Sequence, residues 1–463
     1  MATTLEVQHY AKQTSNKHII LLLVFAILWS TGVSTLAQQD KSVGENSDHV
    51  NALLEAVKSG KIKYGLTKPN EIKALLGEPL RDDNDVNGVM EWFVMRYPVI
   101  EVHFSKFRIY KDDPLTLRSI IIRGKKVNIG GDGLPALRNA NDLKKIESLH
   151  DISLKELDLT DQGDYLKNQA FDTTTLWPPS DKLPPGFDPQ KLLEEGKNPG
   201  LGIRTLHEQG INGEGVGIAI LDQPLLLGHE EYSSRLIRYD ATRASRLKPQ
   251  MHGSPIIGIA VGKTCGVAPG AFVFYYAAPT TAEHQRQADF INEIIKYNET
   301  AGGLGRIRAI SISASPEEAS NNSAWREAHE KAKDAGIFVV TCSEKFMDYG
   351  TLTLVEGKDP DKPESYQLGK YRRSGNVLLI PTGNKTIASY RGVNVYKYER
   401  QGGMSWAAPY IAGLAALAFQ VNPDLQPQAV VEQLVKTATR TKAGPVVDPR
   451  RFIESIRQAA KKQ

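Results

Sequence analysis

The strongest constraint on the fold comes from four short segments in the second half of the chain that are almost entirely apolar. They are residues 216–221, 272–277, 308–313 and 337–340, and stretches with helical patterns separate them. A strand that is apolar on both faces must be covered on both faces, which is typical of a parallel sheet between helices. We therefore predict an α/β domain over residues 201–463, with a parallel sheet covered by helices on both faces and a carboxyl-terminal helix.

A smaller domain precedes it. The chain has 463 residues, enough for two or three domains. Within residues 38–165, the sequence Thr67-Lys68-Pro69 starts a short helix that Gly77 and Pro79 end, and strand-like runs cover residues 90–96, 99–104 and 117–123. This order predicts a small α+β domain. Prolines are dense in residues 166–200, which we interpret as an extended linker.

Charge and cysteine content exclude several classes of protein. Lys and Arg number 57 against 53 Asp and Glu, and the two signs are interspersed, so no basic patch for nucleic acid is present. Two cysteines, Cys265 and Cys342, rule out a disulfide scaffold and a thiolate zinc cluster. The two cysteines either form one disulfide or are buried free thiols.

The first 37 residues have the layout of a secretory signal. Basic residues precede an apolar run over residues 19–29, and small residues lead to Ala37. We predict cleavage after Ala37 and an exported protein, secreted or periplasmic. The alternative is an uncleaved signal anchor, because residues 19–37 carry no charge and are nearly long enough to cross a bilayer. Only in that case would the protein be attached to a membrane.

Two polar residues stand at the ends of apolar segments in the α/β domain. Asp222 follows the run over residues 216–221, and the carboxyl ends of parallel strands are where such sheets place their sites. His252 stands directly before Gly253-Ser254-Pro255, a good start for a helix, and so lies at a helix amino terminus. Taken singly, the aspartate is a turn cap and the histidine a surface residue.

A third candidate, Ser405, lies in Gly402-Gly403-Met404-Ser405-Trp406-Ala407-Ala408-Pro409. A serine at a helix start is usually only a cap. Here glycines before it and small residues after it leave room for a substrate backbone. The Ser405 amide and the positive end of the helix dipole would stabilise an oxyanion formed there.

The three segments that contain Asp222, His252 and Ser405 occur in this order along the chain. Together they resemble the sequence motifs of the subtilisin-like serine proteases, the subtilases (peptidase family S8). Supporting segments also match, including His229-Glu230-Glu231-Tyr232, Gly266-Val267-Ala268-Pro269-Gly270-Ala271 and the strand Gly336-Ile337-Phe338-Val339-Val340. The resemblance covers roughly residues 201–445.

The resemblance implies an exported serine endopeptidase that cleaves a polypeptide substrate through an acyl-enzyme. Ser405 would be the nucleophile, His252 its base, and Asp222 the residue that orients the imidazole. Ser313, Ala314 and Ser315 match the family's substrate-binding edge strand, which pairs with an extended peptide. No cofactor is expected. Calcium sites are common in the family, but no acidic loop with ligand spacing stands out here, and no metal-binding residue is predicted.

The sequence also departs from the family pattern at four places. Gln223-Pro224 follow the aspartate where a small residue and a glycine are usual, and Pro255 replaces the second histidine of the histidine box. Met404 and Trp406 flank the serine in place of threonine and methionine. The stretch after the strand over residues 337–340 reads Thr341-Cys342-Ser343-Glu344-Lys345-Phe346, without the usual oxyanion asparagine, whose loss costs about 10²–10³ in rate.

Two hypotheses therefore remain. The domain is either an active endopeptidase with an altered oxyanion hole or an impaired subtilase fold that binds peptides or partners. We favour the enzyme, because a binding module has no chemical need for all three residues. Residues 38–165 are likewise either a prosegment that is cut away or an accessory module.

Overall fold

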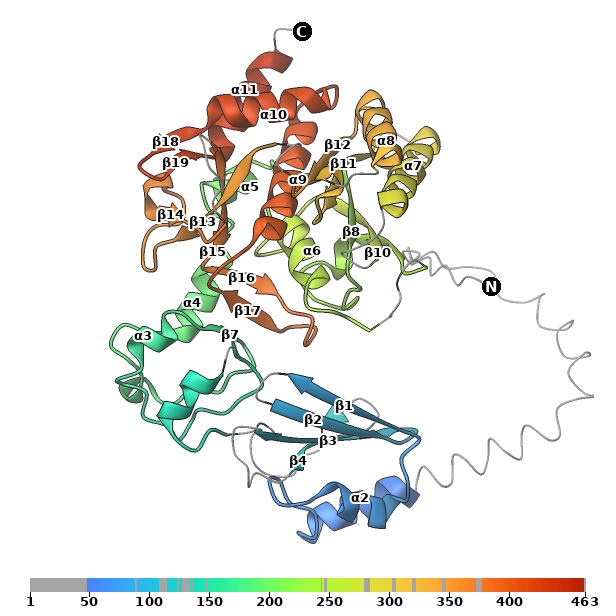
Figure 1. The fold of residues 1–463 in the computed structure, drawn as a ribbon, viewed down its shortest axis with the longest axis vertical. Helices are drawn as coiled ribbons and strands as arrows, with labels where there is room; N and C mark the ends of the chain where they lie inside the picture. The colour runs from blue at the N-terminus through green and yellow to red at the C-terminus, as the bar shows by residue number, and fades with distance from the viewer. Residues whose placement is uncertain are drawn as a thin grey trace, which may run out of the picture. The chain divides into compact units, whose positions relative to one another are not determined.

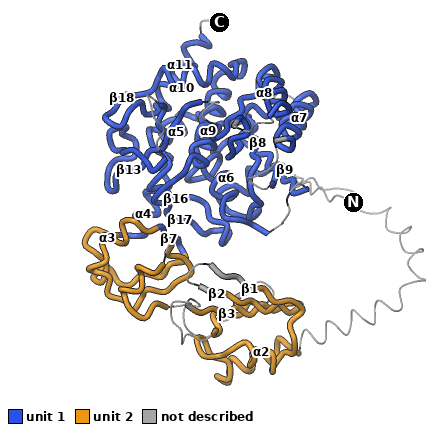
Figure 2. Tube along the Cα trace, in the orientation of Figure 1, with its two compact units in different colours: residues 1–8, 170–173, 188–463 blue, residues 9–169, 174–187 orange. Residues whose placement is uncertain are grey.

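The computed structural model describes residues 48–461, except 88–89, 108–114, 123–124, 127–133, 135, 147, 243, 245–247, 279–283, 302–304, 319–321, 344–346 and 372–376. The chain forms two compact units (Figure 2). One unit is Asp188–Gln463 together with Ala170–Thr173. The other holds the described part of His9–Gln169 and Thr174–Phe187. The predicted signal peptide, residues 1–37, lies outside the described residues.

The smaller unit contains an antiparallel sheet. Its strands follow the chain order β1-β2-β3-β4-β5, so each pairs with its neighbour in sequence (Figure 1). Their bounds are β1 Arg81–Asn87, β2 Met90–Arg96, β3 Ile100–Phe107, β4 Thr116–Ile122 and β5 Lys125–Lys126. Helix α2, Pro69–Leu76, buries Ile72 and Leu76 in the same hydrophobic core as Phe104 of β3. This helix and three of these strands were predicted.

Apart from a helix over residues 48–58, the remaining elements before residue 188 are short. They are η1 Ala140–Lys145, β6 Ser148–Leu149, α3 Gly163–Leu166, β7 Ala170–Asp172 and η2 Ser180–Lys182. Helix α4, Pro189–Glu195, follows and belongs to the larger unit. Asp188 caps this helix by accepting a hydrogen bond from the Lys191 amide, and Pro189 occupies its first turn. Part of the predicted linker is therefore regular structure, since its prolines start a helix.

The larger unit is built on a parallel five-stranded sheet in the order β12-β11-β8-β10-β9. The strands are β8 Gly217–Asp222, β9 Leu236–Asp240, β10 Phe272–Ala277, β11 Ile307–Ile312 and β12 Phe338–Thr341. Every pair between neighbours is parallel. The α/β prediction is confirmed, and the four apolar segments form four of these five strands.

Helices cover both faces of this sheet because successive side chains in a strand point to opposite faces. In β8, Ile218 and Ile220 belong to one hydrophobic core, and Ala219 and Leu221 belong to another. The first core lies against α6 Gly253–Val261 and α9 Met404–Val421, and the second lies against α7 His284–Thr300 and α8 Ser323–Asp334. Figure 1 shows α9 running through the middle of this unit.

A second sheet in the same unit follows the order β14-β13-β15-β19-β18. Its strands are β13 Tyr349–Leu354, β14 Tyr366–Leu368, β15 Leu378–Gly383, β18 Thr439–Thr441 and β19 Gly444–Val446. A hairpin of β16 Lys385–Ala388 and β17 Tyr396–Glu399 is extended by β7, which pairs antiparallel with β17. The other elements are α5 Ile203–Glu208, η3 Ser233–Arg235, η5 Pro316–Glu318, η6 Pro363–Ser365, α10 Pro427–Thr437 and α11 Pro449–Ala460.

Candidate active site

Asp222 is the last residue of β8, and its side chain is fully buried. The Oδ1 atom accepts two hydrogen bonds, from the Gln223 amide at 2.7 Å and from His252 Nδ1 at 2.7 Å. Oδ2 is buried without a hydrogen-bond partner in the described structure. In the described structure, Oδ1 therefore accepts both hydrogen bonds of this carboxylate.

His252 precedes α6 as its N-cap residue, as the sequence predicted for its helix position. Because an ionised carboxylate can only accept hydrogen bonds, Nδ1 carries the proton and Nε2 is left as an acceptor. Burial by itself would lower the pKa of His252, but the hydrogen bond and the charge of Asp222 outweigh it and raise the pKa. The imidazole is thus a stronger base than a free histidine side chain.

Ser405 is the second residue of α9 and is partly exposed. The glycine before the N-cap position is sterically required, since a Cβ atom on Gly402 would collide with the carbonyl of Thr382. Ser405 follows in the first turn, so its amide belongs to the helix end that favours negative charge. The structure thus places this serine where the sequence analysis expected it.

Helices α6 and α9 pack together, which brings the amino terminus of α9 to His252. A Cβ atom on Gly413 of α9 would lie 2.6 Å from Val267 and 3.4 Å from the carbonyl of Ala260. At the helix start, the ring of Trp406 lies 5.2 Å from the His252 ring, at an interplanar angle of 84°. In the described residues no hydrogen bond joins the Ser405 hydroxyl to His252, and such bonds often tighten only with substrate.

The predicted substrate strand follows β11 directly. Ser313, Ala314 and Ser315 are all partly exposed. The Ser313 hydroxyl donates a 3.4 Å hydrogen bond to the carbonyl of Ser405, and the carbonyl of Ala314 accepts one from the Cys342 amide. Ser313 therefore contacts the backbone of Ser405, whereas Ala314 pairs with the segment that follows β12.

Comparisons with known proteins agree on one family. A model of the subtilase family matches residues 355–452, which include Ser405. The subtilisin-like protease PopC of Myxococcus xanthus (strain DK1622) is 24% identical, over 52% of this chain and 58% of PopC. These matches support a divergent member of the subtilase family. Subtilases are serine proteases. The chain spans less than two thirds of the length of PopC.

Two solved structures are also similar to this chain. A protease from Pseudoalteromonas arctica PAMC 21717 matches with a TM-score of 0.42 and 18% identity, over 58% of this chain and 98% of that one. The prenylagaramide maturation protease PagA matches with a TM-score of 0.41 and 16% identity, over 55% of this chain and 98% of that one.

Two residues that contact His252 were noticed in the sequence only as departures from the family pattern. Gln223 accepts a 3.2 Å hydrogen bond from the His252 amide through its side-chain Oε1. Its carbonyl accepts a hydrogen bond from the Tyr275 hydroxyl. Trp406 contacts the imidazole, as described above. The mismatch with the family pattern was the signal that could have identified both residues.

The loop after β8 is held by buried polar groups from the segment His229-Glu230-Glu231-Tyr232. The Tyr232 hydroxyl is 2.8 Å from Ser254 Oγ in α6 and 2.8 Å from the Leu226 carbonyl. Glu231 accepts hydrogen bonds from the amide and hydroxyl of Thr264 and from the Tyr396 hydroxyl. The loop is therefore tied to both ends of α6 and to β17.

The stretch that lacks the oxyanion asparagine is only partly described. Thr341 ends β12, and its hydroxyl donates to Glu317 Oε1 at 2.8 Å. Residues 344–346 lie outside the described residues. The described part of this stretch therefore consists of Thr341, Cys342 and Ser343. Thr341 and Ser343 are completely buried.

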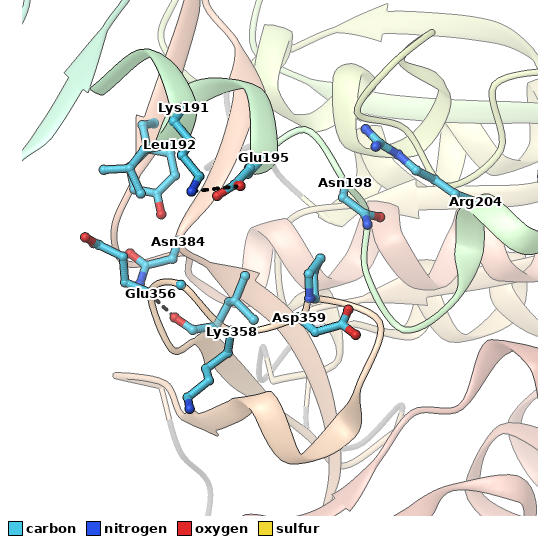
Figure 3. Close-up of a pocket in the computed structure, with 14 residues that line it drawn as sticks. Lys191, Leu192, Glu195, Asn198, Arg204, Glu356, Lys358, Asp359 and Asn384 are labelled. Atoms are coloured by element: carbon cyan, nitrogen blue, oxygen red, sulfur yellow. Dashed lines mark hydrogen bonds and ion pairs between the residues drawn. The ribbon is translucent and has the colours of Figure 1, made fainter. Parts of the chain in front are cut away.

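A separate pocket of about 440 Å³ lies in the larger unit (Figure 3). Its walls come from α4, the loop after β13, Asn384 and Tyr398. Lys191 and Glu195 form an ion pair of 3.7 Å on one wall. None of Asp222, His252 and Ser405 lines this pocket, so it is distinct from the site of these three residues.

Three further findings concern the cysteines, possible metal clusters and apolar helices of the described residues. Cys265 and Cys342 are both buried and form no disulfide. No cluster of three or more His, Cys, Asp or Glu residues suited to a metal lies within the described residues. In the same part of the chain, one helix is long and apolar enough to cross a bilayer, α9, and 78% of it is buried inside the protein.

Proposed function

We propose that the chain is a serine endopeptidase that hydrolyses peptide bonds with Ser405, His252 and Asp222. The observation that carries the proposal is the 2.7 Å hydrogen bond between His252 Nδ1 and Asp222 Oδ1, beside the helix that begins at Met404. It leaves Nε2 of a basic imidazole available next to a partly exposed serine. A hydroxyl becomes a useful nucleophile when such a base is adjacent.

The reaction proceeds in two halves. Ser405 Oγ attacks the carbonyl carbon while His252 Nε2 takes its proton, and the imidazolium then protonates the leaving amine. The acyl-enzyme is hydrolysed by water through the same base. Asp222 keeps the imidazole in the required tautomer and stabilises its charged form, without taking the proton itself.

The negative charge on the tetrahedral intermediate is stabilised at the start of α9. The Ser405 amide and the dipole of this 18-residue helix supply that stabilisation. An extended polypeptide would pair with the backbone of Ser313, Ala314 and Ser315, which are partly exposed next to Ser405. The reaction as written needs no cofactor and no metal.

Export is a further part of this proposal. Residues 1–37 would be removed as a signal peptide, and residues 38–165 would act either as a prosegment or as an accessory module. Mass determination of the mature amino terminus tests the first point, and an intact Met1 contradicts it. Comparing the mature chain in wild type and Ser405→Ala tests self-processing, which equal sizes would exclude.

Two observations favour a second candidate, a subtilase fold that binds peptides without cleaving them. The described residues contain no hydrogen bond between Ser405 and His252, and the family's oxyanion asparagine is missing. Such a protein would still bind an extended peptide along Ser313–Ser315 but would turn over no substrate.

Labelling with a fluorophosphonate probe separates the two candidates. The endopeptidase proposal predicts that wild type is labelled and that Ser405→Ala and His252→Ala are not. A peptide library then gives the cleavage preference. If the folded wild-type protein is not labelled, or if Ser405→Ala is labelled equally, the enzyme proposal is wrong and the binding candidate stands.

A further inference from the structure

Two residues that depart from the subtilase pattern both contact His252. The side chain of Gln223 accepts a hydrogen bond from the His252 amide at 3.2 Å. The ring of Trp406 lies 5.2 Å from the imidazole in an edge-to-face arrangement. Gln223 follows the aspartate of the triad and Trp406 follows its serine, so each connects one triad member to the histidine.

Gln223 makes its contacts with three different groups. Its amide donates to Asp222 Oδ1 at 2.7 Å, and its side chain accepts from the His252 amide. Its carbonyl accepts from Tyr275 of β10. Since Asp222 Oδ2 has no partner in the described structure, the Gln223 amide and His252 Nδ1 make the only hydrogen bonds that orient the carboxylate.

The start of α6 also rests directly on Gln223. A Cβ atom on Gly253 would collide with the Gln223 carbonyl and with the Tyr275 hydroxyl. Gly253 is the first residue of α6, immediately after His252. A shift of the Gln223 backbone would therefore move the residue that carries the imidazole.

The placement of Trp406 is not explained by hydrogen bonding. The residue is 8% exposed, and its indole N–H is buried without an acceptor in the described part of the chain. Burying a donor without a partner is unfavourable, and the packing of the ring in the hydrophobic core shared by α6 and α9 offsets that cost. Its edge-to-face contact with His252 falls in the separation range where aromatic pairs attract.

We propose that Gln223 and Trp406 are positioning residues that together hold the His252 imidazole between Asp222 and Ser405. This inference rests on the proposed endopeptidase function. Gln223 fixes the backbone of His252 and the carboxylate that it contacts, and Trp406 fixes the ring relative to the helix of the nucleophile. Neither side chain is assigned a contact with substrate.

The first test compares variants that restore the family residues with variants that conserve the contact. In Gln223→Ser and Trp406→Met, kcat should fall about 3- to 10-fold, in the range expected for losing one such contact, while KM stays within about twofold. Trp406→Phe keeps an aromatic ring and should retain most of the activity. If Trp406→Phe loses as much as Trp406→Met, an aromatic ring at this position does not restore activity and the ring-packing role is wrong.

Gln223→Glu is tested through the pH profile of activity, which should not change if Gln223 has a purely structural role. It keeps an acceptor for the His252 amide but adds negative charge near the imidazole. The titratable groups already around this site are Asp222, which bonds the ring, and Tyr275, which contacts Gln223. We expect kcat to be largely retained and the acidic limb of the pH profile to move to higher pH. A profile that does not move overturns the assignment of Gln223.

The double variant Gln223→Ser/Trp406→Met tests whether the two residues act on the same group. Residues that position one group are not additive, so the double variant should lose about as much as the worse single variant. Losses that multiply would show independent roles. Gln420→Ala and Trp325→Phe are the matched controls. Gln420 also bonds backbone amides, those of Asn212 and Gly213, and Trp325 is a buried indole in α8.

Nuclear magnetic resonance of His252 separates failure of this inference from failure of the proposed function. In a Ser405→Ala background, the Nδ1 proton bonded to Asp222 should give a downfield signal. Adding Gln223→Ser or Trp406→Met should broaden the signal or shift its titration, and the controls should not. If wild type is inactive but the signal responds, the protease proposal fails and the positioning role stands. If wild type is active but neither kcat nor the signal responds, the positioning role is wrong.

Discussion

Lys385 lies with its Nζ atom 4.9 Å from the centre of the Tyr410 ring, and both side chains are buried. Its ammonium group donates a hydrogen bond to the carbonyl of Pro199, at 2.8 Å. Burial lowers the pKa of Lys385 to about 7. A lysine in such surroundings costs free energy whenever it carries a proton.

Replacing this lysine should therefore stabilise the protein in a pH-dependent way. Between its folded pKa of about 7 and the ordinary value of 10.5, the unfolded chain binds more protons at Lys385, so its contribution to stability rises with pH. The slope is at most about 1.4 kcal/mol per pH unit. Lys385→Met should be more stable than wild type at pH 7, by a margin that shrinks towards pH 10. Urea unfolding at several pH values measures it, with the exposed Lys358→Met as control. A margin that does not depend on pH would contradict the buried charge.

Activity should be lost as pH falls through the pKa of His252. The neutral imidazole is the base, and its pKa is raised by Asp222 against the effect of burial. The midpoint of the acidic limb of kcat/KM should thus lie above the ordinary value of 6.5. Asp222→Asn removes the charge and reverses the donor, so kcat should fall by about 10⁴. A wild-type midpoint below 6 would show that Asp222 does not control the base.

The parallel sheet could be predicted because a strand that is buried on both faces is apolar along nearly its whole length. Residues 216–221 and 272–277 are apolar at nearly every position, and they pair in register as β8 and β10. Among the edge strands, β12 is apolar and was predicted, but β1 and β9 are not apolar throughout. β1, Arg81–Asn87, contains four charged residues in seven and was not predicted, and β9 ends in Arg238-Tyr239-Asp240.

The departure from the family pattern marks Gln223 in the sequence, but its contact with His252 could not be predicted, and neither could the burial of Lys385. The bond from Gln223 to the His252 amide spans 29 residues and depends on how two loops meet. No periodicity or motif encodes that meeting. Lys385 is similar, because only the folded chain shows that its ammonium group is enclosed by Pro199 and Tyr410.

Glu231 should make stability sensitive to acid. Burial by itself would raise the pKa of Glu231, but hydrogen bonds from Thr264, Tyr396 and Cys265 outweigh it and lower the pKa. The contribution of Glu231 to stability is thus present above the pKa that it has in the unfolded chain. It is lost as the pH falls through the lower pKa that it has in the folded protein. Glu231→Gln should cost about 1–3 kcal/mol at pH 7 and less below pH 4. Thermal unfolding at both pH values checks this, and an equal cost at the two would contradict it.

The glycines before Ser405 should differ sharply in their tolerance of alanine. A Cβ atom on Gly402 would collide with the backbone carbonyl of Thr382, whereas one on Gly403 would meet only the Tyr371 ring at 3.6 Å. Gly402→Ala must displace the segment that leads into α9, so it should lose about 1–3 kcal/mol of stability and most probe labelling. Gly403→Ala changes an N-cap residue and should cost less than about 1 kcal/mol. Unfolding and labelling rates of both variants test this, and equal effects would mean that the backbone at Gly402 relaxes freely.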